Sequence, residues 1–548
     1  MTEALGSGMT ADTFGWDTVY AIHYADVNAA IVKVWPANPL HVTQAQGPVS
    51  IDGDFAPWRV VLGGSGHLLH VETPVPVLAY DGGSGGVMYD ATVEIEVELE
   101  FVPQPANTRV RKRGGGKWMD LRVKAPAANA AVSVLDVTYA GAQPSDLDKA
   151  VIHDLFRQWF NDAGNLQSFN TVFASVNLNA KAEHDAFQWL APTTVSYAVA
   201  EEAALPDGVF AVLCMTENRS ATGLAHQVSA AAIPLGQRSA FLISRERYLR
   251  KLLLPGVALM FEAPTGSDPA AKWPEDYFEI SDGGASLTNT RRICVPQLEI
   301  EPNNVREATI DSGDYVVRFE DTQLAIDITS MRHGYRAGLN FLRVAHTIRT
   351  TATATLVGDQ KFALSPGDGR QSIVVTKDPV AEWVEIGVVG ATLLLVVGGL
   401  AVGAYRTWRA GQAVVEANQM IQSGELAANA ALPVGEAAID EAAGAQAALG
   451  VCMGRVAGAG SFLRGTWSAY RATAAAGLST AGAAVISILK MLEFAANVDS
   501  QHFLPDFDEF AAAAMAPVQW PQAQSEFTVR AVAFNGSLQA AGDPGFAD

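Results

Sequence analysis

Apolar side chains recur at helical spacing over Thr13–Trp35, close to the start of the chain. They fall three or four residues apart, which places them on one face of a helix. The stripe consists of Trp16, Val19, Tyr20, His23, Val27, Ala30, Ile31 and Val34. Pro36 follows and ends the pattern. The sequence therefore predicts one amphipathic helix that is long enough to lie along a whole sheet.

Strand patterns dominate the next part of the chain. Ala91–Phe101 alternates apolar residues with glutamates, so it predicts a strand with one buried face and one solvated face. Tyr315–Ile328 and Leu339–Leu356 predict further long strands. Asp148–Phe160 and Ser244–Leu254 have helical spacing instead. Long strands with few helices between them favour an extended, curved antiparallel sheet.

The composition changes after Lys377. From Ala381 to about Val498 the chain is rich in Ala and Gly and has almost no strand pattern, which predicts an α-helical insertion over residues 381–505. Strand spacing returns at Phe527–Leu538, so we expect the chain to rejoin the sheet there. The predicted organisation is a body formed by residues 1–380 and 506–548, with the insertion between its two parts.

One segment of the insertion is apolar over a membrane-spanning length. Ile386–Ala404 has nineteen residues without a charge, which passes the usual threshold for a transmembrane helix. Gly399 and Gly403 would let a second helix approach closely, and Ala472–Leu489 is a suitable partner. Three interpretations stay open at this point: a buried hairpin, a reversible membrane contact, and a transmembrane anchor.

Net charge and cysteine content limit the classes of partner and the cellular compartment that we expect for this chain. The chain has 548 residues, 49% of them hydrophobic, and a formal net charge of −21, which argues against nucleic acid. Its three cysteines are far apart and include no C-x-x-C pair, as expected of buried thiols. The first residues lack the basic and apolar regions of a Sec signal, so we expect a cytoplasmic protein. Membrane association and export by a non-Sec route are the open alternatives.

Signals for catalysis or metal binding are weak. Gly82–Gly86 matches the G-x-S-x-G nucleophile motif, but strand patterns on both sides predict a hairpin turn instead. His67 and His70 are three residues apart in a strand pattern and would point to opposite faces, so they should not share a metal. No H-E-x-x-H occurs. We expect a protein that is not an enzyme and that uses no metal or cofactor.

Two basic clusters stand out from the acidic background. Arg111, Lys112 and Arg113 lie beside a Gly-Gly-Gly turn, and Arg247 and Arg250 precede three consecutive leucines. Cations next to an apolar run suit an anionic lipid headgroup. The alternative is a solvated turn and a solvated helix face.

Four sequence segments also carry a resemblance to a known family. They are Phe14–Ala21 (FGWDTVYA), Phe169–Asn177 (FNTVFASVN), Phe241–Ser244 with Leu252–Pro255 (FLIS, LLLP), and Trp520–Pro521 with Phe534–Ser537 (WP, FNGS). Together they resemble the tubular lipid-binding (TULIP) proteins encoded beside botulinum neurotoxin in clostridia. The resemblance implies an α+β fold in which long, bent antiparallel sheets wrap around long helices. It also implies a lipid or fatty acid as ligand and a protein partner from the same gene cluster.

The predicted function is binding of a lipid or another elongated hydrophobic ligand in an apolar groove, because an aliphatic wall is better covered by an acyl chain than by water. The candidate lining residues are Trp16, Tyr20, Val27, Ile31, Val93, Ile95, Val97 and Leu99. For each of them a plain core role is the competing interpretation. Two alternative functions stay open: a toxin-cluster accessory protein that assembles with a partner, and a protein that contacts membranes through its apolar hairpin.

Overall fold

The computed structural model describes most of the residues that lie outside the predicted insertion. The described residues are 10–35, 40–83, 85–104, 117–124, 132–169, 171–180, 185–201, 207–255, 257, 261–264, 266–301, 304–337, 340–357, 361–366, 370–377, 510, 514–520 and 527–545. They belong to two compact units: Met1–Ser244 with Asp508–Asp548, and Arg245–Phe507. The insertion, Ile386–Ala404 and the basic residues Arg111, Lys112 and Arg113 lie outside the described residues.

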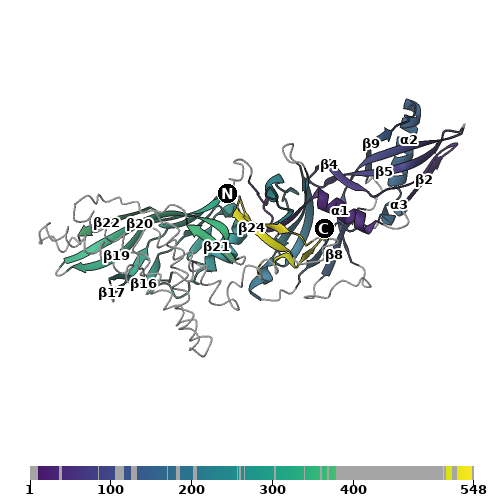
Figure 1. The fold of residues 1–548 in the computed structure, drawn as a ribbon. Coiled ribbons are helices and arrows are strands. Elements are labelled where there is room, and N and C mark those ends of the chain that lie inside the picture. Colours follow the sequence, from purple (N-terminus) through teal and green to yellow (C-terminus); the bar gives the residue numbers. More distant parts are fainter. Residues whose placement is uncertain are drawn as a thin grey trace, which may run out of the picture. The chain divides into compact units, whose positions relative to one another are not determined.

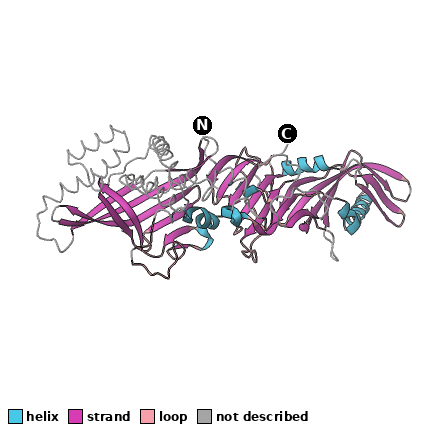
Figure 2. Cartoon of the chain, turned by 90° about the horizontal axis from the view of Figure 1, so that it is seen from below, coloured by secondary structure: helices cyan, strands magenta, loops and turns pink. Residues whose placement is uncertain are grey.

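Antiparallel strands are the main regular structure in the described parts of both units, as Figure 2 shows. The centre of the first unit is a six-stranded sheet, here called the core sheet. Its order is β11 (Pro192–Ala200), β12 (Val209–Thr216), β1 (Thr18–His23), β13 (Ser239–Ile243), β25 (Leu538–Asp543) and β24 (Thr528–Phe534). The C-terminal part of the chain therefore does rejoin the sheet, as predicted, although it forms a hairpin of two strands rather than one.

The segment predicted as one helix, Thr13–Trp35, is not one helix. Its first half forms strand β1, and only Tyr24–Val34 forms a helix, α1. β1 pairs with β12 on one side and β13 on the other, and both of its faces are buried. A strand buried on both faces has an unbroken apolar run, which a helical stripe can match equally well. The β-branched residues Thr18, Val19 and Ile22 favour the strand.

Both faces of the core sheet are packed against other parts of the first unit. On one face Val19, Ala21 and Leu213 join an apolar cluster with Val228 and Ile233 from the segment after β12. On the other face Tyr20 packs against Phe241 with ring centroids 4.9 Å apart, and its hydroxyl donates to the Ala514 carbonyl. A short sheet consists of β23 (Val518–Gln519), β10 (Ala174–Leu178), β8 (Lys117–Val123) and β7 (Leu99–Pro103). Phe173 and Trp520, which flank β10 and β23, pack against Phe210 of the core sheet.

A third sheet of the first unit, here called the curved sheet, carries the longest strands of that unit. Its order is β2 (His41–Gln46), β3 (Val49–Asp54), β5 (Leu68–Asp81), β6 (Gly86–Val97) and β9 (Val132–Ala140), and β4 (Arg59–Ser65) also pairs with β5. Figure 1 shows α2 (Asp146–Phe160) lying against it, with the short helix α3 (Ala163–Ser168) following. The strand predicted over Ala91–Phe101 is thus broken at Glu98, where β7 leaves for the short sheet.

The turn between β5 and β6 settles the role of the glycine-rich motif. β5 ends at Asp81 and β6 begins at Gly86, so strands flank the turn on both sides. Gly83 has φ +85°, a conformation that favours glycine, and its amide donates to Asp81 Oδ1. The predicted hairpin turn is confirmed. A nucleophile elbow would require a helix after the turn.

The second unit contains one nine-stranded sheet. Its strands are β14 (Phe278–Ile280), β15 (Ser286–Asn289), β16 (Ile293–Glu301), β17 (Asn304–Ile310), β18 (Tyr315–Glu320), β19 (Gln323–Ala337), β20 (Asn340–Val357), β21 (Lys361–Pro366) and β22 (Arg370–Lys377). β20 confirms the strand predicted over Leu339–Leu356. The strand predicted over Tyr315–Ile328 is wrong, because a turn at Asp321 and Thr322 divides it into β18 and β19.

Helices are few and short among the described residues. The helix predicted over Ser244–Leu254 consists of α4 (Arg245–Arg247) continued by a π-helical segment, Tyr248–Leu253. Short 3₁₀ helices occur at Asp185–Leu190, Ala230–Ala232 and Asp282–Gly284. The antiparallel sheets of the predicted fold class are therefore present, whereas the described part of the chain lacks its long helices. None of the described helices has the length and apolarity needed to cross a bilayer.

Candidate binding site inside the curved sheet

Helix α2 begins with a strong cap and presents one apolar face. The Ser145 hydroxyl accepts from the Asp148 amide, and Asp146 and Asp148 place negative charge at the positive end of the helix. Its buried residues follow at helical spacing: Ile152, Leu155, Phe156, Trp159 and Phe160. The predicted helix over Asp148–Phe160 is confirmed, and this face is buried against the curved sheet.

The curved sheet turns an aliphatic wall toward its buried face. β5 and β6 alternate buried residues with more exposed ones along most of their length. Residues of the wall with almost no exposed surface are Leu69, Val71, Val75, Leu78, Ala91, Val93, Ile95 and Val97. The opposite face carries charged residues such as Glu94 and Glu96. The wall and α2 thus enclose an apolar interior.

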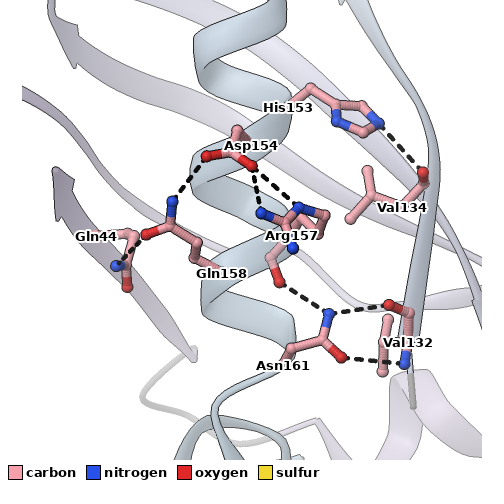
Figure 3. Close-up of polar contacts among 8 residues, drawn as sticks. All are labelled: Gln44, Val132, Val134, His153, Asp154, Arg157, Gln158 and Asn161. Atoms are coloured by element: carbon pink, nitrogen blue, oxygen red, sulfur yellow. Dashed lines mark hydrogen bonds and ion pairs between the residues drawn. The ribbon is translucent and has the colours of Figure 1, made fainter. Parts of the chain in front are cut away.

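The sheet curls around α2, as two neighbouring helix residues reveal (Figure 3). Gln158 Oε1 accepts from Gln44 Nε2 in β2, and Asn161 hydrogen-bonds to Val132 in β9. β2 and β9 are opposite edges of the sheet and would lie about 19 Å apart if it were flat. Because Gln158 and the C-cap residue Asn161, only three residues apart, reach both edges, the strands must bend toward each other.

Polar side chains of α2 satisfy backbone groups along the β9 edge. The Asn161 amide donates to the Val132 carbonyl at 2.9 Å and accepts from the Val132 N–H at 3.3 Å. His153 Nε2 lies 3.1 Å from the Val134 carbonyl, so it carries a proton and donates. We call His153, Gln158 and Asn161, with their three partners, the α2 clasp. It closes the curved sheet over its apolar interior.

Asp154 orients one member of the clasp. Its carboxylate accepts from the Arg157 guanidinium at 2.6 Å and from Gln158 Nε2 at 2.7 Å. The Arg157 guanidinium holds the pKa of Asp154 below its usual value. With its nitrogen fixed by an ionised carboxylate, the Gln158 amide turns its oxygen toward Gln44. A charged network on the helix surface thereby sets the clasp on the β2 side.

The start of α2 is tied to β5 by a second polar contact. The Tyr80 hydroxyl donates to Asp148 Oδ1 at 2.9 Å, and the Ser145 hydroxyl donates to Asp148 Oδ2 at 2.6 Å. These bonds hold the pKa of Asp148 below its usual value, with Ser145 the larger cause. Burial, followed by the bond to Asp148, raises the pKa of Tyr80 to about 12. Helix α2 is thus held by polar contacts near both of its ends.

Aromatic rings close the interior near the end of α2. Trp159 and Phe160 pack on Phe55, with ring centroids 5.0 and 5.8 Å away. Trp58 stacks on Phe169 with centroids 3.7 Å apart. These rings form an aromatic cluster beside the C-terminal end of α2.

The candidate lining residues predicted from the sequence lie in different parts of the first unit. Val93, Ile95 and Val97 lie on the aliphatic wall, whereas Leu99 begins β7 of the short sheet. Trp16 and Tyr20 belong to the packing of the core sheet, and Val27 and Ile31 are buried on α1, which contacts β1, β4 and β12. Their role in ligand binding stays a prediction.

The predicted headgroup residues that the structure describes have different surroundings. Arg247 is 1% exposed. Arg250 is half-exposed, and its guanidinium pairs with Glu246 on the same helical segment at 3.4 Å. Their contact with a headgroup also stays a prediction.

Sequence reasoning missed α2 as the helix inside the sheet. The apolar spacing of Ile152, Leu155 and Phe156 was a usable signal for a buried helix, but nothing in it identifies which sheet the helix enters. Among the described residues, no three histidine, cysteine or acidic side chains converge in a group that could hold a metal.

Comparisons with known proteins agree with this architecture. The sequence is 29% identical over 287 residues to OrfX3 of Clostridium botulinum (strain Kyoto / Type A2), covering 47% of this chain and 57% of that protein. It is 29% identical over 349 residues to OrfX3 of Paraclostridium bifermentans, covering 57% of this chain and 68% of that protein. The match to the botulinum relative thus spans less than two thirds of that relative's length.

A solved structure shows the same fold at low sequence identity. The crystal structure of P47 of Clostridium botulinum E1 superposes with a TM-score of 0.54 at 12% identity, covering 97% of this chain and 99% of that one. These findings confirm the resemblance to the TULIP proteins encoded beside botulinum neurotoxin. The sequence profile described as "OrfX-like: Protein OrfX2/OrfX3/P47" matches residues 13–288, just over half of the chain, and the chain therefore belongs to the OrfX-like family.

Proposed function

We propose that this protein binds a lipid, a fatty acid or another elongated hydrophobic molecule between α2 and the curved sheet, without catalysing a reaction. The observation behind this function is the aliphatic wall of β5 and β6, faced by the apolar side of α2. An acyl chain that replaced part of the α2 contact would keep both apolar surfaces away from water. The TULIP-like fold supports the same class of ligand.

The clasp suggests how a ligand would enter. Moving α2 away from β9 breaks the bonds from Asn161 and His153, and moving it from β2 breaks the Gln158–Gln44 bond. In water each such bond is replaced by a bond to solvent, so its net contribution is only about 1 kcal/mol. The apolar interior can therefore open without a large polar penalty.

Exchange kinetics test this function. The purified protein, stripped of any bound lipid by organic extraction, is mixed with a fluorescent fatty acid. Binding should be saturable. The double variant Asn161→Ala/Gln158→Ala should take up and release the probe several-fold faster, because three bonds of the clasp are lost.

Gln143→Ala is the matched control. Gln143 donates its amide to the Tyr139 carbonyl on the same strand β9, yet it precedes α2 and does not hold the helix. Its exchange rates should equal those of the parent. Absence of probe binding by the parent would refute the proposed function, and equal rates for the double variant would refute entry past α2.

A second function rests on a different observation. The chain belongs to a family named for OrfX and P47 proteins, and Ile386–Ala404 is an apolar run of spanning length. A toxin-cluster accessory protein could use that segment to assemble with a protein partner or to contact a membrane peripherally. Liposome flotation and co-purification with a cluster-encoded protein, each repeated without residues 381–505, would separate these roles.

A further inference from the structure

Two histidine rings meet at the place where the core sheet joins the curved sheet. The centroids of His67 and His226 lie 3.8 Å apart. Ser196 Oγ lies 2.6 Å from His226 Nδ1 and 3.5 Å from His67 Nε2, so one hydroxyl stands against both rings. His67 follows β4, His226 follows β12, and Ser196 is in β11. Three separate segments of the first unit therefore converge on this pair.

The same place carries the backbone connection between the two sheets. Gly66 and Val199 exchange both hydrogen bonds, at 3.2 and 2.9 Å, which links the β4–β5 turn to β11. The Tyr197 hydroxyl donates to the His67 carbonyl and accepts from the Leu99 amide, each at 2.6 Å. Glu201 accepts from the amides of Gly63 and Gly64. We call this set of contacts the seam.

The geometry disfavours a metal or a nucleophile at the pair. A metal held by two histidines must lie about 2.0 Å from a nitrogen of each ring, and the Ser196 hydroxyl already stands between those nitrogens. The described residues provide no third histidine, cysteine or acidic ligand. An activated serine would also need donors for an oxyanion, whereas the nearby Gly66 amide is bonded to Val199. A proton is the remaining species that the rings can accept.

The surrounding charges do not compensate a protonated pair. The charged groups that act on His67 are His226, Glu98 and Lys124, and Glu98 is itself paired with Lys124 at 2.5 Å. Burial, then His226, lowers the pKa of His67 from its ordinary value, and burial lowers the pKa of His226. Both rings are therefore neutral at pH 7. The remaining carboxylate of the seam, Glu201, is occupied by the two glycine amides and by the Tyr24 hydroxyl.

We propose that His67 and His226 form a proton-operated release for the seam, closed at neutral pH and opened when both rings become charged. Two imidazolium groups at this spacing repel each other, and Ser196 can no longer donate to either ring. Separation of the rings pulls the β4–β5 turn away from β11 and breaks the Gly66–Val199 pairing. The proposal does not depend on the ligand proposed above.

The direction of the pH effect follows from linkage. Because the folded-state pKa values lie below the unfolded value of about 6.5, the unfolded or opened chain binds protons first as the pH falls. The contribution of the two histidines to the stability of the closed seam is fully present above the unfolded pKa of about 6.5. It is lost as the pH falls through the folded-state values.

Hydrogen exchange of the intact protein at pH 7.5 and pH 5.5, corrected for the intrinsic rate, tests the release. In the parent, protection of the Gly66 and Val199 amides should fall about tenfold at the lower pH, because the opened seam binds protons more tightly than the closed one. Protection of β1 and β12 should stay unchanged. The variant His67→Gln/His226→Gln should keep the seam protected at both pH values.

His41→Gln is the matched control. His41 lies on β2 of the same unit, and its hydrogen bonds to Asp54 and Asp52 raise its pKa, the opposite direction. This variant should open its seam in acid as the parent does. The proposal would be overturned if the Gly66 and Val199 amides of the parent were equally protected at both pH values. It would also be overturned if the double variant lost as much protection in acid as the parent, or if β1 and β12 lost protection together with the seam.

A titration of the parent covers the case in which the double variant does not fold. Followed by NMR, the two ring signals should titrate below the ordinary histidine value and depend on each other, so that His226→Gln alone raises the pKa of His67. Independent titration at or above the ordinary value would also overturn the release.

Discussion

Two asparagines act as substitutes for a missing neighbouring strand. Asn28 on α1 donates to the Val60 carbonyl at 2.9 Å and accepts from the Val60 amide at 2.7 Å, on β4. Asn161 makes the same pair of bonds with Val132 on β9. A primary amide offers the donor and acceptor that an adjacent peptide group would offer, so each asparagine covers part of an open strand edge. An amide side chain therefore suits both positions.

The asparagine pairing predicts a specific loss. Asn161→Asp keeps the size of the side chain but replaces the donor with an oxygen that faces the Val132 carbonyl, so stability should fall by about 1 to 2 kcal/mol. Asn28→Asp should behave alike. Urea unfolding measures the change, and midpoints equal to that of the parent for both variants would contradict the edge-covering role.

A buried carboxylate anchors the start of β1. Asp17 has no exposed surface and accepts from the Thr216 amide and hydroxyl, at 2.8 and 2.9 Å, and from Arg219. Asp17→Asn should cost about 3 kcal/mol, because it removes a buried charge partner. Glu72→Gln, which breaks the exposed pair with Arg59, should cost less than about 1 kcal/mol. Equal losses in thermal unfolding would contradict this ranking.

At the scale of elements, the sequence predicted a helix or strand correctly where its apolar spacing fits only one kind of secondary structure. Where the spacing fits both a helix and a strand, the prediction failed. α2 has one apolar face and a Ser cap, so only a helix fits it. β1 is buried on both faces, and its apolar run fits a helix or a strand until its neighbours β12 and β13 are known. The turn at Asp321 and Thr322 lies in the polar run Glu320–Gln323, where the apolar alternation breaks and changes phase, so the sequence does carry a signal against one continuous strand.

The candidate site divides in the same way. Strand alternation identified Val93, Ile95 and Val97 as one apolar face. The α2 clasp joins residues far apart in sequence, such as Gln44 and Gln158, and depends on the curl of the sheet. His67 and His226 are likewise brought together by the pairing of other strands. Local spacing carries no information on such contacts, because tertiary packing determines them.

Burial of α2 predicts a contrast within one helix. Leu155 is fully buried against the curved sheet, whereas Leu147 in the first turn is 75% exposed. Leu155→Ala should destabilise the first unit by about 2 to 5 kcal/mol, and Leu147→Ala by less than about 0.5 kcal/mol. Denaturant titration of both variants checks this. Similar losses at the two positions would mean that α2 does not pack as described.

At the scale of the whole molecule, the curved sheet, α2 and the seam all lie in the first unit, which contains none of residues 381–505. Replacing residues 381–505 with a short Gly/Ser linker should therefore leave a soluble, β-rich protein with unchanged uptake of a fluorescent fatty acid. Circular dichroism and the uptake assay check the two parts of this prediction. An insoluble product, or one that has lost uptake, would show that the predicted insertion belongs to the folded body.

Photo-crosslinking tests directly whether an elongated hydrophobic ligand lies between α2 and the curved sheet. A fatty acid with a diazirine near the middle of its chain is bound to the intact protein, activated by light, and mapped by mass spectrometry. We expect adducts on peptides from β6 (Gly86–Val97) and α2 (Asp146–Phe160), and unlabelled fatty acid should compete with their formation. No competable adduct, or adducts confined to other segments, would contradict this placement of the ligand.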